Sequence, residues 1–159
     1  MYKRILVPVD GSHTSNQALA ASLQLAKDFG SRIRLIHVIN ELTGLGGFYQ
    51  SGGYPGDLRD VLPENGTRIL DEAMARTRTS GLEAGRVLAE GFNLRLGEAV
   101  VDAANHWMAD LIVIGTHGRR GIGRMLLGSG AEQIIRLAPV PVLVVRSKTQ
   151  ENAAAKAGA

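Results

Sequence analysis

The alternation of apolar runs with amphipathic segments limits the folds open to this chain more than any other feature. Five short apolar runs have the character of β-strands, at residues 3–9, 32–39, 86–90, 110–115 and 140–145. After each of the first four comes a segment with the apolar spacing of a helix, at residues 15–29, 57–80, 95–108 and 129–138. Because the first strand is apolar almost throughout, its sheet should be covered on both faces. The pattern predicts an α/β fold with one open, five-stranded parallel sheet and helices on both faces.

The length of 159 residues and the apolar content of 45% are typical of a single domain with a sizeable core. We expect this domain to span residues 1–146. The segment 147–159 carries little apolar bulk, and we expect it to be disordered. Within the helix at 57–80, Pro63 and Gly66 are residues that could break the first turn.

Composition excludes several classes of function. The chain has no cysteine, so disulfides, thiolate metal sites and thiol catalysis are ruled out. The net charge is only +3 and aromatic residues make up 4%, which argues against a nucleic-acid-binding surface. No apolar run is long enough to predict a signal peptide or a membrane span, so we expect a cytoplasmic protein that does not bind membranes.

A glycine-rich loop follows the fourth apolar run. Gly115 and Gly118 are separated by nine residues from Gly128 and Ser129, and a helix is predicted to begin at Ser129. A glycine-rich loop between a strand and a helix can present backbone N–H groups to phosphate oxygens. The pattern therefore favours a phosphate-binding loop, although such loops are also common in α/β folds that bind no phosphate.

A second motif ends the first strand, where Val9 is followed by Asp10, Gly11 and Ser12. Together with the glycine-rich loop and the closing sequence of residues 138–145, this motif resembles the universal stress protein family, in its ATP-binding branch. The resemblance covers residues 2–146. It implies a Rossmann-like sheet of the adenine nucleotide alpha hydrolase type with strand order 3-2-1-4-5, which would bring the ends of the first and fourth strands together.

The resemblance also implies a site for ATP and Mg²⁺. Pro8 and Val9 would line the base and ribose pocket, and the backbone at Val38 would hold the adenine edge. Ribose would meet Asp10 and Gly115. The phosphates would contact Gly118, Gly128 and Ser129, and Arg119 would add positive charge. Mg²⁺ would bridge the phosphates near Asp10.

Each of these residues also has a purely structural interpretation. Asp10 is a turn former, or the N-cap of the following helix. Ser129 and Glu132 have the spacing of a capping box, S-x-x-E, which stabilises a helix N-terminus without any ligand. His117 could contact phosphate or be solvated. The arginines at 119, 120 and 124 would by default form a solvated loop.

The function implied is that of a nucleotide-dependent stress-response regulator or sensor with an unknown protein partner. The chain has no G-x-x-x-x-G-K-[ST] motif and no evident base for attack on a γ-phosphate, so any ATPase activity should be slow. A slow ATP-hydrolysing or phosphate-transferring enzyme and a nucleotide-free interaction module remain alternatives. The resemblance also implies a homodimer that pairs through the last strand, 140–145. The glycine-rich segment 40–56 is expected to close over the nucleotide or to meet a partner.

Overall fold

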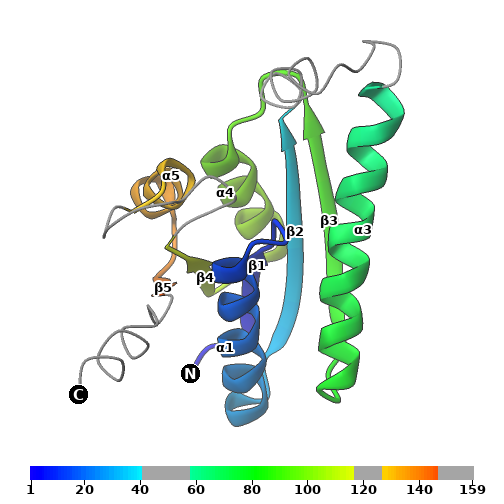
Figure 1. The fold of residues 1–159 in the computed structure, drawn as a ribbon. Helices are drawn as coiled ribbons and strands as arrows, with labels where there is room; N and C mark the ends of the chain where they lie inside the picture. Colours follow the sequence, from blue (N-terminus) through cyan, green and yellow to red (C-terminus); the bar gives the residue numbers. More distant parts are fainter. Residues whose placement is uncertain (41–57, 117–126, 147–159) are drawn as a thin grey trace, which may run out of the picture.

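The computed structural model describes residues 1–40, 58–116 and 127–146, with the side chains of 58–60 left undescribed. In chain order the elements are β1 (Arg4–Pro8), α1 (His13–Phe29), β2 (Arg32–Asn40), α3 (Leu58–Thr79), β3 (Ala84–Gly91), α4 (Leu96–Trp107), β4 (Leu111–Gly115), α5 (Ser129–Leu137) and β5 (Val142–Val145). Figure 1 shows these helices and strands as one layered unit.

The five strands form one parallel sheet with the order β3-β2-β1-β4-β5. Ile5 at the centre of β1 lies opposite Ile33 of β2 on one side and Leu111 of β4 on the other. The predicted fold class and strand order are therefore confirmed. Because β1 and β4 are neighbours, the Asp10 turn and the glycine-rich loop leave the same edge of the sheet.

The core has two halves, one on each face of the sheet. Neighbouring strand residues point to opposite faces, so Ile5 belongs to the half covered by α1 and α3, whereas Leu6 belongs to the half covered by α4 and α5. Both side chains have no exposed surface. Burial of a side chain of this size stabilises the fold by about 1.5–3 kcal/mol, so double coverage of the sheet supplies most of the driving force.

Helix α3 runs unbroken through Pro63 and Gly66, so the predicted break in its first turn is wrong. Gly66 is buried, and a Cβ atom there would lie 2.9 Å from both Ile39 Cδ1 and Leu88 Cδ1. The glycine is thus explained by the close approach of α3 to β2 and β3.

Several element ends also differ from the prediction. Helix α1 begins at His13, because the Ser12 hydroxyl caps it by accepting from Ser15 N–H at 3.2 Å. At the other end, Gly30 is the C-cap, with φ of 66°, a left-handed conformation that favours glycine. The last strand begins at Val142 and not at residue 140, since Pro141 has no N–H to donate to a neighbouring strand.

Candidate functional site

A cleft of about 660 Å³ opens at the carboxyl ends of the strands. Its floor is made by the ends of β1, β2 and β4, and its walls by the N-terminal ends of helices α3, α4 and α5. In an open parallel sheet this edge, where strand order reverses, is where ligands bind. Of the predicted site residues, seven line this one cleft: Pro8, Val9, Asp10, Val38, Gly115, Gly128 and Ser129.

Asp10 is held in a tight turn between β1 and α1. Its Oδ1 atom accepts a hydrogen bond from Ser12 N–H at 2.9 Å, and its own N–H donates to Ser15 Oγ at 3.2 Å. Gly11 has φ of 78°, a left-handed conformation that favours glycine. Asp10 is therefore a turn former, whereas the N-cap of α1 is Ser12. These contacts fix the carboxylate at the cleft.

The backbone of Val9 is fully engaged next to the cleft. Its N–H donates to the Ile36 carbonyl at 2.8 Å, and its carbonyl lies 2.7 Å from Nδ1 of His37. Because a carbonyl can only accept, Nδ1 of His37 carries the proton. His37 is buried, and its hydrogen bond ties the residue after β1 to β2.

Residue 115 is a glycine for a reason of packing. A Cβ atom at this position would lie 2.7 Å from the backbone C and O atoms of Thr14, at the start of α1. Gly115 lines the cleft, but its missing side chain admits the N-terminus of α1 onto β4.

The start of α5 corrects the capping prediction. The N-cap is Gly128, no side chain caps this helix, and Ser129 is its first residue. Glu132 donates its N–H to the Gly128 carbonyl at 2.9 Å, while its carboxylate lies 3.6 Å from Arg136. The S-x-x-E pattern is therefore not a capping box. Within the described part of the chain, the Ser129 hydroxyl makes no hydrogen bond.

Both ends of the glycine-rich loop are tied together. Gly128 N–H donates to the Thr116 carbonyl at 2.8 Å, and Thr116 N–H donates to the Val145 carbonyl at 3.1 Å. The residue after Gly115 thus contacts Gly128 directly, and both glycines line the cleft. Gly118 and Arg119 lie outside the described residues, as do His117, Arg120, Arg124 and almost all of the 40–56 segment.

Sequence reasoning missed the contributions of helices α3 and α4 to the cleft, and it named only the first residue of α5. Leu62 and Asn65 come from α3, Arg95 precedes α4, and Gly130 follows Ser129 in α5. A Cβ atom on Gly130 would lie 2.5 Å from Leu96 Cδ2, so α4 and α5 touch at this wall. These contributions could have been predicted from the topology, because each helix that follows a parallel strand begins at the edge of the sheet where that strand ends.

The model of the universal stress protein family matches residues 1–146 of this chain. The chain belongs to the universal stress protein family.

Individual relatives agree with this assignment. Universal stress protein MJ0531 of Methanocaldococcus jannaschii is 32% identical over 151 residues, covering 95% of this chain and 86% of the relative. The solved structure of MJ0577 from the same organism is 28% identical and matches with a TM-score of 0.77, covering 94% of this chain and 99% of the other. A family member from Burkholderia pseudomallei is 33% identical with a TM-score of 0.68, covering 92% and 97%.

More distant family structures share the fold and were solved with ligands. One from Archaeoglobus fulgidus is described as a complex with dAMP, at 23% identity, 91% and 98% coverage, and a TM-score of 0.67. One from Arabidopsis thaliana is described with AMP bound, at 15% identity, 94% coverage of both chains, and a TM-score of 0.63.

Metal binding in this universal stress protein would rest on few protein groups. Among the described residues, no group of three or more histidine, aspartate or glutamate side chains could hold a metal ion. Asp10 is a single carboxylate at the cleft, which fits Mg²⁺, since this ion is commonly held by one or two carboxylates and by substrate phosphates. None of the described helices is long and apolar enough to cross a membrane.

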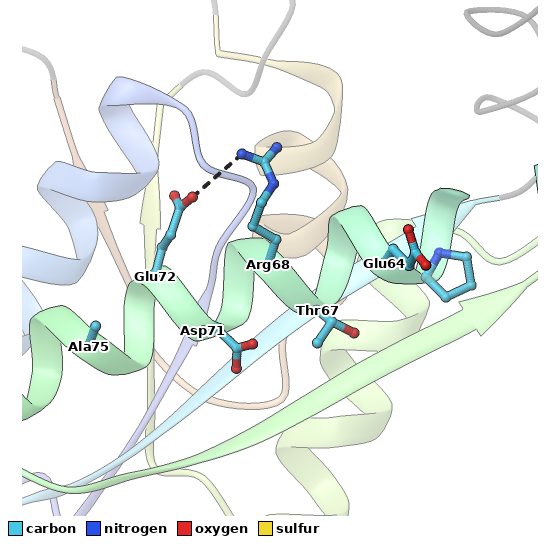
Figure 2. Close-up of a pocket in the computed structure, with 7 residues that line it drawn as sticks. Glu64, Thr67, Arg68, Asp71, Glu72 and Ala75 are labelled. Atoms are coloured by element: carbon cyan, nitrogen blue, oxygen red, sulfur yellow. Dashed lines mark ion pairs between the residues drawn. The ribbon is translucent and has the colours of Figure 1, made fainter. Parts of the chain in front are cut away.

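A second depression of about 610 Å³ lies along the outer side of α3 (Figure 2). Among the residues that the structure describes, those that line it all come from that one helix. The described residues thus give it a single wall, whereas they wall the cleft on several sides.

Proposed function

We propose that this universal stress protein binds ATP with Mg²⁺ in the cleft and acts as a nucleotide-dependent regulator or sensor of the stress response. The observation that carries the proposal is the convergence of the Asp10 turn, the end of β2 and the first turn of α5 on one cleft. A volume of about 660 Å³ lies within the range of roughly 300–1,000 Å³ that is usual for small-molecule sites. The family structures described with dAMP and AMP support an adenine nucleotide as the ligand.

The proposed roles follow from position. Adenine would lie against the end of β2 at Val38, beside Pro8 and Val9, and ribose would meet Asp10 and Gly115. The phosphates would lie at the N-terminus of α5, where the first N–H groups of a helix have no partner in the helix itself and attract anions. Gly128 and Ser129 belong to this terminus, and the proposal adds Gly118 and Arg119.

When bound, Mg²⁺ would supply positive charge that offsets the charge of the phosphates. Asp10 is the residue of the cleft that would hold it. The Ser129 hydroxyl, which caps no helix, would be available to a phosphate oxygen.

The experiment is a thermal melt of nucleotide-free protein with and without Mg-ATP, after identification of any nucleotide released by denaturation. Several hydrogen bonds to charged groups and a buried base make a dissociation constant near micromolar reasonable, about −8 kcal/mol. At ATP one hundred times above that constant, the stabilisation is about 2.7 kcal/mol. For a domain of this size we expect a rise in melting temperature of about 5–11 °C.

A melt without Mg²⁺ would measure the contribution of the metal. An unchanged melting temperature at millimolar Mg-ATP would refute nucleotide binding and favour an interaction module. A turnover number near the enzyme median of roughly 10 s⁻¹, abolished by Asp10→Asn, would instead favour an ATP-hydrolysing enzyme.

We also propose that two copies pair through β5, in the cytoplasm, and that a protein partner reads the nucleotide state. Strand β5 is at an edge of the sheet, and Leu143 is 40% exposed. On the neighbouring helix α5, Ile135 and Leu137 are also exposed. An uncovered apolar edge invites pairing with another strand. Light scattering should show a dimer at micromolar concentration, and Leu143→Lys should shift it toward monomer.

A further inference from the structure

Asn65 of α3 lines the cleft from the side opposite α5. The next residue, Gly66, is pressed against β2, since a Cβ atom there would lie 2.9 Å from Ile39 Cδ1 and 3.0 Å from His37 Cδ2. This contact fixes the turn of α3 that carries Asn65. The backbone of Asn65 is therefore held at the rim of the cleft.

The side-chain amide of Asn65 has a defined orientation. Arg68 Nη2 donates to its Oδ1 atom at 2.7 Å. A guanidinium has donors and no acceptor, so the amide atom that meets it must be the oxygen. The amide nitrogen is thus turned away from Arg68, and within the described residues it makes no hydrogen bond.

Arg68 is itself held from the other side. Its Nη1 atom lies 3.6 Å from Glu72 Oε1, and Figure 2 shows this pair along the outer side of α3. Both side chains are largely exposed, so the pair adds little to stability. Its physical effect is to restrict the guanidinium, and through it the amide of Asn65.

We propose that Asn65 is a specificity-determining residue, which donates a hydrogen bond from its amide nitrogen to an acceptor on the nucleoside half of the bound nucleotide. The acceptor is a ring nitrogen of the base or an oxygen of the ribose. This inference rests on the proposed function. The phosphates belong at the N-terminus of α5, on the other face of the sheet, so the nucleoside is the part of the ligand that remains for α3.

The test compares Asn65→Asp with the unmodified chain by calorimetric titration of the nucleotide-free protein. Aspartate keeps the size of asparagine and an acceptor for Arg68 but has no N–H to donate. We expect affinity for ATP and for AMP to fall by a similar factor, about two- to tenfold. The affinity for inorganic tripolyphosphate, which has no nucleoside and is measured by competition, should be unchanged. The melting temperature of the ligand-free protein should also be unchanged.

Two controls isolate the amide. Thr67→Asp adds the same charge to the exposed side of α3 and should leave all three affinities unchanged. Arg68→Met frees the amide to rotate and should weaken ATP and AMP about twofold, whereas Glu72→Gln should have a smaller effect because it leaves the contact between Arg68 and Asn65 intact.

Unchanged ATP and AMP affinity in Asn65→Asp would overturn the inference. Equal weakening of tripolyphosphate would also overturn it, because the residue would then act on the phosphates through charge. These outcomes differ from failure of the proposed function, in which the unmodified protein would bind neither ATP nor AMP.

Discussion

Gly115→Ala tests whether packing or ligand access explains the first glycine of the loop motif. The added Cβ atom would lie 2.7 Å from the C and O atoms of Thr14 and 2.9 Å from its Cβ. Two of these three atoms are backbone, so no side-chain rotation relieves the clash. Gly115 does not have a positive φ, hence the cost is steric and not conformational.

The size of the destabilisation expected for Gly115→Ala depends on how firmly Thr14 is held. Thr14 is buried in the first turn of α1, and that turn is fixed by the Ser12 cap. Overpacking a site that cannot relax typically costs about 1–3 kcal/mol. One kcal/mol lowers the melting temperature of a domain of this size by about 2–4 °C, so we expect a fall of about 2–12 °C.

The assay is a thermal melt of the ligand-free protein, with Gly85→Ala as the matched control. A Cβ atom on Gly85 would meet no backbone atom and only the side chain of Arg34, whose Nε would lie 3.3 Å away, and Gly85 is exposed. That variant should melt within about 2 °C of the unmodified chain, since surface substitutions usually stay within ±0.5 kcal/mol. If Gly115→Ala melts at the unmodified temperature, the packing argument is refuted.

Three further substitutions are predicted. Met108 is the C-cap of α4, with φ of 54°, and its side chain is exposed. Met108→Gly should therefore relieve left-handed strain and raise the melting temperature by about 1–4 °C. A fall in melting temperature would contradict this. The Asp110 carboxylate accepts hydrogen bonds from the backbone N–H groups of Lys3 and Arg4 at 2.8 and 2.9 Å. Asp110→Ala should therefore lower the free energy of unfolding, measured in urea, by about 1–3 kcal/mol. An unchanged unfolding midpoint would refute this. Ser129→Ala should leave the melting temperature of the ligand-free protein within about 1 °C of the unmodified chain, because Ser129 caps no helix. The same substitution should weaken ATP binding about tenfold in a titration. A destabilised protein with normal ATP affinity would instead give Ser129 a purely structural role.

Local sequence pattern was enough to predict the elements of this fold but not their arrangement. The apolar run around Ile5 indicates a covered strand, and the structure buries it completely. Nothing local places that strand between β2 and β4, and the order came from the family resemblance. Strand order depends on which helices cover which face, and that is a property of the assembled layers.

Element ends and caps were predicted least well, for a related reason. The S-x-x-E pattern at Ser129 has the spacing of a capping box, but the N-cap is Gly128. Gly128 is fixed by a hydrogen bond to Thr116, across the whole glycine-rich loop. A contact between residues this far apart in sequence sets the start of the helix, so a four-residue pattern could not reveal it.

The glycines of the cleft show why the loop motif coincides with the cleft. A side chain on Gly115 would meet α1, one on Gly130 would meet Leu96 of α4, and one on Gly66 would meet β2. All three permit a helix end to approach a strand or another helix at the carboxyl edge of the sheet. Close approach of helix N-termini is also what concentrates unpaired N–H groups there and makes the edge attractive to anions. The close approach of helix ends thus explains both the glycines required by packing and an edge that attracts anions. A motif interpreted as a phosphate-binding loop therefore marks the cleft, even where one of its glycines is explained by packing.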